Sequence, residues 1–163
     1  MRILLVEDDE NKRLQITSFL RERYSSIMAS DELICRASYR SGLKACIDEN
    51  FDLLLLDMTM STFDHSATEA GGRPRHFAGR DILRELKRRK RLLPTIVCTG
   101  FDVIGEGTER RTLAALTDEL HDQFKGVFLG TVYYTPSERS WRVDLETILN
   151  QFLKGRLGAN TNS

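Results

Sequence analysis

The sequence predicts a single α/β domain in which helices cover both faces of a five-stranded parallel sheet. Short apolar runs alternate five times with longer amphipathic stretches, which is the pattern of repeated βα units. The run at 53–56 consists of four leucines, as expected for a strand that is buried on both faces. With 24 basic and 24 acidic side chains among 163 residues, the composition is that of an ordinary globular domain and gives no reason to expect a nucleic-acid partner.

Each expected element follows from a local pattern. The strands are short apolar runs at 2–6, 33–37, 53–56, 95–99 and 126–134. The helices have apolar side chains at three- and four-residue spacing and lie at 11–24, 41–50, 79–91, 108–124 and 140–157. Right-handed crossovers leave few topologies, and the flavodoxin-like strand order 2-1-3-4-5 pairs the first strand with the third. We assign residues 1–157 to one domain, with a long loop inserted at 61–78 and a flexible tail at 158–163.

Acidic side chains follow the first and third strands. Glu7 and Asp8 belong to a run of four acids after the first strand, and Asp57 ends the leucine run. In the predicted order these carboxylates meet at the carboxyl edge of the sheet, with Thr99 beside them. Such hard oxygen ligands suit Mg²⁺. The alternatives are that the acid run only favours the N-terminus of the following helix and that Asp57 only caps a turn.

Other polar groups are weaker candidates for function. His65 and His76 lie in the inserted loop, but no further soft ligand clusters with them, so we do not expect a metal there. Five consecutive basic residues at 87–91 favour a solvated helix end, and nucleic-acid contact is the less favoured alternative. Gly105 and Gly107 match no phosphate-binding fingerprint.

The remaining composition bears on compartment. The three cysteines, at positions 35, 46 and 98, have no metal-like spacing, so we expect reduced thiols in a cytoplasmic protein. No apolar run approaches the roughly 20 residues that span a bilayer, so we expect no membrane partner. The chain begins at once with a strand, which leaves no room for a signal peptide.

Three short motifs resemble those of the receiver domains of two-component response regulators. They are VEDD at 6–9, LLLLDMTM at 53–60 and CTG at 98–100, and the helical stretch GRDILRELKR at 79–88 is also similar. The resemblance covers about residues 1–157. It implies that Asp57 is the phosphoacceptor and that Thr99 offers its hydroxyl to the phosphoryl group. It further implies that Mg²⁺ is held by Glu7, Asp8, Asp57 and the backbone carbonyl of Thr59.

The same resemblance implies a function in signalling. We expect a stand-alone phosphoprotein of a phosphorelay that accepts a phosphoryl group from a histidine kinase or a phosphotransfer protein. The face formed by the last two helices is expected to contact a downstream protein, and pairing of two copies of the chain stays open. Phosphatases of the haloacid-dehalogenase type also use an aspartate at a strand end, but they need a second aspartate where this chain has Thr59. We therefore do not expect an enzyme.

The chain also departs from the receiver pattern. Receivers typically carry a lysine at the end of the fifth strand, where Tyr133 or Tyr134 stands here. Lys125 precedes that strand and is expected at the wrong end of the sheet. The usual proline after the acceptor is replaced by Ser61, which opens the insertion at 61–78. These departures favour an alternative, in which the chain is a pseudo-receiver that binds partner proteins without being phosphorylated.

Overall fold

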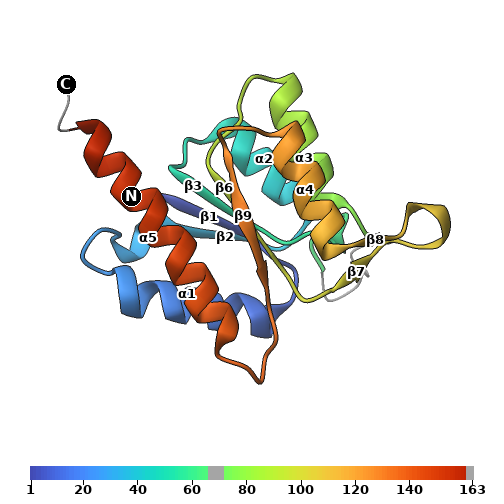
Figure 1. The fold of residues 1–163 in the computed structure, drawn as a ribbon, viewed down its shortest axis with the longest axis horizontal. Helices are drawn as coiled ribbons and strands as arrows, with labels where there is room; N and C mark the ends of the chain where they lie inside the picture. The colour runs from blue at the N-terminus through green and yellow to red at the C-terminus, as the bar shows by residue number, and fades with distance from the viewer. Residues whose placement is uncertain (66–71, 161–163) are drawn as a thin grey trace.

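The computed structural model describes residues 1–65 and 72–160. Its central sheet contains five parallel strands in the order β2-β1-β3-β6-β9, as Figure 1 shows. These strands are β1 (Ile3–Val6), β2 (Leu33–Arg36), β3 (Leu53–Leu56), β6 (Thr95–Thr99) and β9 (Phe128–Tyr133). The order corresponds to 2-1-3-4-5 among the strands of the sheet, so the predicted fold class is confirmed.

Helices cover both faces of this sheet (Figure 1). One face carries α1 and α5, and the other carries α2, α3 and α4. Their bounds are α1 (Glu10–Tyr24), α2 (Tyr39–Asp48), α3 (Ala78–Arg88), α4 (Leu113–Gln123) and α5 (Ser140–Asn160). A short 3₁₀ turn, η1 (Ser30–Glu32), precedes β2. Of the predicted tail, residues 158–160 continue α5, and residues 161–163 lie outside the described part of the chain.

The leucine run of β3 lies at the centre of the molecule. All four side chains of β3 are fully buried. Leu54 and Leu56 pack into the core beneath α2, α3 and α4, whereas Leu53 and Leu55 pack into the core beneath α1 and α5. Alternate side chains of a strand point to opposite faces, so a strand covered on both sides needs apolar residues at every position.

Two short antiparallel pairs of strands extend the carboxyl edge of the sheet. The first pairs β4 (Met60–Ser61) with β5 (Pro74–Arg75), so the predicted loop at 61–78 has paired ends. Residues 66–71 of that loop lie outside the described part of the chain. The second pairs β7 (Val103–Ile104) with β8 (Arg111–Thr112) around the 3₁₀ turn η2 (Gly107–Glu109), and it projects past α4 in Figure 1.

The second pair explains why the fourth helix begins later than predicted. Arg111 is paired with Ile104, and the Thr112 side chain accepts the N–H of Ala115 as the N-cap of α4. Gly105 has a φ of +85°, a backbone conformation that side chains with a Cβ rarely adopt, and it turns the chain between the two strands. The predicted helix at 108–124 therefore consists of a turn, a two-residue strand and the helix α4.

The basic run at 87–91 forms the end of α3 and contacts neighbouring helices. Lys87 Nζ donates to the carbonyl of Gln123 at 2.7 Å. Arg91 donates to the carbonyls of Ile47 and Glu49, both at 3.0 Å, where α2 ends. Unsatisfied carbonyls at a helix C-terminus attract such cations. The run therefore has a structural role at two helix ends.

The cysteines and the helices concern the expected reduced thiols and the expected lack of a membrane-spanning segment. Cys35, Cys46 and Cys98 are free thiols, and the last two are buried. Across residues 1–65 and 72–160, no helix combines the length and apolar character that crossing a bilayer requires.

Candidate functional site

The parallel register brings the acids of two strands together. Val6 of β1 is aligned with Leu56 of β3, so the residues that follow them are also neighbours. The backbone N–H of Asp57 donates to the carbonyl of Val6 at 2.9 Å, which extends the pairing by one step. One carboxylate oxygen from each of Glu7, Asp8 and Asp57 lies within 4.8 Å of the others. The structure thus brings together the three acids that the sequence places at this edge.

The first turn of α3 is packed against the backbone of Asp57. The N–H of Gly79 donates to the carbonyl of Met58 at 3.1 Å. A Cβ atom at Gly79 would lie 2.5 Å from the carbonyl oxygen of Asp57, which is too close for any side chain. Glycine is therefore required here, because the helix and the strand end approach each other backbone to backbone.

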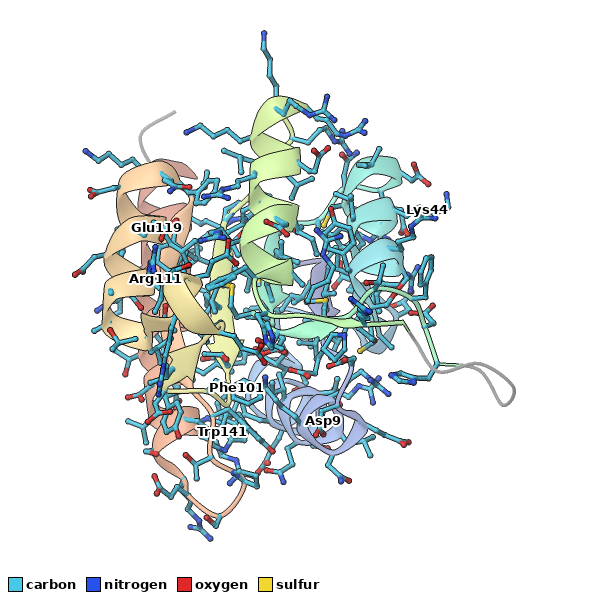
Figure 2. The ribbon with its side chains drawn as sticks, turned by 90° about the vertical axis from the view of Figure 1, so that its right-hand side faces the viewer. Asp9, Lys44, Phe101, Arg111, Glu119 and Trp141 are labelled. Atoms are coloured by element: carbon cyan, nitrogen blue, oxygen red, sulfur yellow. The ribbon has the colours of Figure 1, made fainter. Side chains whose placement is uncertain are left out.

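The acids open into a cavity of about 390 Å³. In Figure 2, the labelled Asp9 and Phe101 lie at this end of the molecule. Beyond the acid trio, the residues that line the cavity come from α1, β4, β5 and the segments after β3, β6 and β9: Asp9, Lys12, Thr59, Met60, Pro74, Gly100, Phe101, Tyr134 and Pro136. The two antiparallel strands after β3 therefore form part of its wall.

Hydrogen bonds attach that wall to the acids. Asp8 Oδ2 accepts the backbone N–H of Ser61 at 2.8 Å, which ties β4 to the end of β1. The Thr59 hydroxyl donates to the carbonyl of His76 at 2.9 Å, so the side chain of Thr59 is used for structure while the residue still lines the cavity. Ser61, which stands where receivers typically have a proline, therefore provides a backbone N–H that proline lacks.

Thr99 lies at the end of β6 and is fully buried. Its hydroxyl oxygen accepts the N–H of Phe101 at 3.3 Å. Gly100 and Phe101, the next two residues in the chain, line the cavity, whereas Thr99 is not among the described residues that line it. Because the oxygen only accepts in this bond, the hydroxyl hydrogen of Thr99 is not used by Phe101, but the side chain does not line the cavity in this structure.

A lysine from the first helix occupies the centre of the acid cluster. Lys12 Nζ donates to Asp57 Oδ1 at 2.8 Å and to the carbonyl of Cys98 at 2.8 Å. It also forms an ion pair with Glu7 Oε2 at 2.6 Å. The side chain of Lys12 is 7% exposed, so its ammonium group is held by protein groups on several sides.

The N-terminus of α1 fixes the position of this lysine. Asp9 is the N-cap of the helix, and its side chain accepts the backbone N–H of Lys12 at 2.8 Å. Lys12 therefore sits in the first turn, and its side chain reaches beneath the ends of β1 and β3. Within the acid run, helix capping is the role of Asp9, whereas the carboxylates of Glu7 and Asp8 point to other partners.

Burial and charge act in opposite directions on the ionisation of this cluster. Burial and then the charge of Asp57 raise the pKa of Glu7 to about 8, although Lys12 opposes both effects. Burial also raises the pKa of Asp57, against the lowering effect of Lys12. Burial lowers the pKa of Lys12, but the charges of Asp57 and Glu7 outweigh it and raise the pKa overall. Lys12 is therefore a permanent cation in this site.

Sequence reasoning missed Lys12, although the sequence holds a signal for it. Positions 12, 16, 20 and 24 form one row of α1 at four-residue spacing, and all four residues are buried. Three of them are Ile16, Leu20 and Tyr24. A lysine on an otherwise apolar row predicts a buried cation that needs a carboxylate partner.

The donor set suits a divalent cation of the hard type. Glu7, Asp8 and Asp57 offer carboxylate oxygens, the ligands that Mg²⁺ prefers in proteins. Within residues 1–65 and 72–160, neither His65 nor His76 belongs to a group of three metal-binding side chains. His76 instead lies 3.6 Å from Glu106, across the two antiparallel strand pairs.

Comparisons with known proteins point to one class. No profile of an established protein family matches the chain. It is 28% identical over 148 residues to an uncharacterized protein, y4jR, of Sinorhizobium fredii, covering 90% of this chain and 95% of that one. It is 26% identical over 147 residues to the Detocs response regulatory protein DtcB of Enterobacter cloacae, covering 89% and 95% of the two chains.

A solved receiver domain has the same fold as this chain. The signal receiver domain of an HD-domain-containing protein from Pseudomonas fluorescens superposes with a TM-score of 0.60 at 15% identity, covering 96% of this chain and 97% of that one. The chain therefore has the receiver-domain fold of response regulators, and the predicted resemblance is confirmed at the level of the fold. Its form is atypical, because β9 ends in Tyr133 and is followed by Tyr134 where receivers typically carry a lysine.

Proposed function

We propose that this protein is a receiver of phosphorelay signalling that accepts a phosphoryl group on Asp57. The observation that carries the proposal is the convergence of one carboxylate oxygen from each of three acids, within 4.8 Å of one another, at the ends of two paired strands. Asp57 is 4% exposed and lines the cavity, so its carboxylate borders the space that a phosphodonor would enter. The fold supports a signalling domain in preference to an enzyme.

The proposed roles follow from position. Glu7, Asp8, Asp57 and the backbone carbonyl of Thr59 would hold Mg²⁺, since all four residues line the same cavity. When bound, the ion offsets the repulsion between the carboxylate and the anionic phosphodonor. Thr99 would donate its hydroxyl hydrogen to an oxygen of the phosphoryl group, since its oxygen only accepts the N–H of Phe101. A contact of this kind would couple the phosphoryl group to the backbone after β6.

The proposed partners are a histidine kinase or phosphotransfer protein as donor and a downstream protein as recipient of the signal. The face of α4, β9 and α5 is the proposed output surface, because Thr99 ends β6, which pairs directly with β9. The Thr117 hydroxyl donates to that of Thr131 at 2.9 Å, which links α4 to β9. Free thiols at the three cysteines fit a reducing, cytoplasmic compartment.

A mass measurement tests this function. The purified chain is incubated with Mg²⁺ and acetyl phosphate, and its intact mass is recorded at intervals. We expect one phosphoryl adduct in the wild type and none in Asp57→Asn. Asp122→Asn is the matched control, because Asp122 is an exposed aspartate on α4 and its removal should leave the adduct in place. A wild type that takes up no phosphoryl group would favour the pseudo-receiver alternative.

A further inference from the structure

The cation that faces Asp57 comes from an unexpected element. Lys12 belongs to α1, and its Nζ atom contacts Asp57, Glu7 and the carbonyl of Cys98 at 2.6–2.8 Å. The carbonyl of Cys98 lies on β6, so the ammonium reaches across the ends of three neighbouring strands. Lys12 also lines the cavity, which places its charge at the surface that a phosphodonor would meet.

An aromatic ring after β9 faces the ammonium of Lys12. Tyr134 is 6% exposed, and its ring packs against Trp141 with centroids 5.3 Å apart. Lys12 Nζ lies 5.6 Å from the centre of the Tyr134 ring, over its face. An aromatic face attracts a cation. Tyr134 therefore supports the ammonium of Lys12 from the side of β9.

We propose that Lys12 is the residue of the phosphorylation site that binds the phosphoryl group through its positive charge, supplied by α1 instead of β9. This inference rests on the proposed function of Asp57. In the resting protein the ammonium of Lys12 donates to Oδ1 of Asp57 and so orients that carboxylate. In the phosphorylated protein the same ammonium donates to the oxygens of the aspartyl phosphate, while the Cys98 carbonyl keeps it in place.

The chemical step requires no proton from Lys12. A carboxylate oxygen of Asp57 forms a bond to phosphorus as the bond between phosphorus and the leaving oxygen of acetyl phosphate breaks. The electron pair of the broken bond leaves with acetate. The ammonium stabilises the oxygens of the transferring group and stays protonated throughout. Lys12 is thus a catalytic residue that acts by its charge and not by acid–base exchange.

Labelling kinetics of Lys12 variants test the proposal. In Lys12→Met the aliphatic chain is kept and the charge is lost, so the rate of adduct formation from acetyl phosphate should fall about 100-fold, as for the loss of one transition-state donor. Lys12→Arg keeps the charge and should stay within about tenfold of the wild type. Lys44→Met is the matched control, since Lys44 is a solvent-exposed lysine on the outer side of α2, away from the cavity (Figure 2).

The outcomes separate this inference from the proposed function. Equal labelling of the wild type and Lys12→Met, both dependent on Asp57, would overturn the role of Lys12 and leave the phosphoacceptor standing. No labelling of the wild type would overturn both. Circular dichroism checks that each variant is folded. If Lys12→Met does not fold, Lys12→Gln takes its place, and the same fall of about 100-fold in the labelling rate is expected.

A second measurement uses the unmodified chain and does not depend on turnover. The protein is labelled with ¹⁵N at its lysine side chains, and its NMR spectrum is recorded before and after Mg²⁺ and beryllofluoride are added. Beryllofluoride is a mimic of the bound phosphoryl group. The Nζ resonance of Lys12 should shift, because its ammonium would exchange a carboxylate for the fluorides of the mimic. The resonance of Lys44 should stay in place. A Lys12 resonance that does not move once beryllofluoride is bound would contradict the proposal.

Discussion

The ammonium nitrogen of Lys12 lies 2.8 Å from Oδ1 of Asp57, although the two residues are 45 positions apart. The contact joins the first turn of α1 to the end of β3. Glu7 shares the same ammonium at 2.6 Å, so one buried cation serves two buried carboxylates. Because one cation is shared by two carboxylates, loss of the lysine and loss of one carboxylate should change the stability of the protein by different amounts.

Removal of Lys12 should cost far more stability than removal of the charge of Asp57. In Lys12→Met both carboxylates lose their ion-pair partner, and breaking a buried pair in this way costs about 3–5 kcal/mol. In Asp57→Asn the ammonium keeps Glu7 as its partner, so the free energy of unfolding should change by about 1 kcal/mol or less. Urea unfolding without Mg²⁺ at pH 9, above the pKa of about 8 that Glu7 has in the folded protein, measures both.

The double variant Lys12→Met/Asp57→Asn provides the control. It should be more stable than Lys12→Met alone, because one of the two unpaired carboxylates is gone. Independent addition of the two single effects would show that Lys12 and Asp57 do not interact in solution.

The affinity for Mg²⁺ should rise with pH up to about pH 8. Burial first, and then the charge of Asp57, raise the pKa of Glu7 from 4.5 to about 8, so the folded protein without metal keeps a proton there that the unfolded chain releases. The stabilisation that this proton provides is present below pH 4.5 and is lost as the pH rises towards 8. A metal ligand must give up its proton, so binding should tighten by up to about tenfold per pH unit below the pKa.

Titration calorimetry at several pH values between 6 and 9 measures this dependence. Glu7→Gln should weaken the binding of Mg²⁺ and remove most of the variation with pH. The same affinity at pH 6 and pH 8 in the wild type would mean that Glu7 binds no proton in the relevant range or is not a ligand.

Two substitutions of Asp8 should separate its proposed metal contact from its hydrogen bond to β4. Asp8→Asn keeps an oxygen for the N–H of Ser61, whereas Asp8→Ala removes it. Both should weaken Mg²⁺ binding by about tenfold or more, because a charged ligand is lost. Only Asp8→Ala should speed hydrogen exchange of the Ser61 amide in the absence of metal. Equal exchange in the two variants would show that the bond does not hold β4.

The sequence was sufficient to predict what depends on strand order. Leu53 to Leu56 predict a strand covered on both faces, because every position is apolar. Glu7 and Asp57 each follow a strand, and parallel strands end at the same edge of a sheet, so their meeting follows from the topology. These predictions rest on residues whose neighbours are set by regular backbone pairing.

The parts that sequence reasoning missed depend on single side chains or very short elements. Lys12 stands on the apolar row of α1, which is a signal for a buried cation, but nothing local shows that its partner is Asp57, 45 positions away. The strands β7 and β8 have two residues each, too few for an alternating pattern to be recognised. The sequence shows Tyr133 or Tyr134 in place of a lysine, but not that the ring face of Tyr134 supports the lysine that comes from α1.

Two glycine substitutions should change stability in opposite directions. Gly79→Ala places a Cβ atom 2.5 Å from the carbonyl oxygen of Asp57, where only backbone could move, and we expect a loss of about 1–3 kcal/mol. Gly155→Ala in α5 meets nothing within 4 Å, so the higher helix propensity of alanine should stabilise the protein by up to about 1 kcal/mol. Because the first turn of α3 packs against the backbone of Asp57, Gly79→Ala should also slow phosphorylation of Asp57. Gly155→Ala should leave that rate unchanged. Urea unfolding and the acetyl phosphate assay measure the two effects, and a Gly79→Ala protein as stable and as readily labelled as the wild type would show that α3 can move away from Asp57 at no cost.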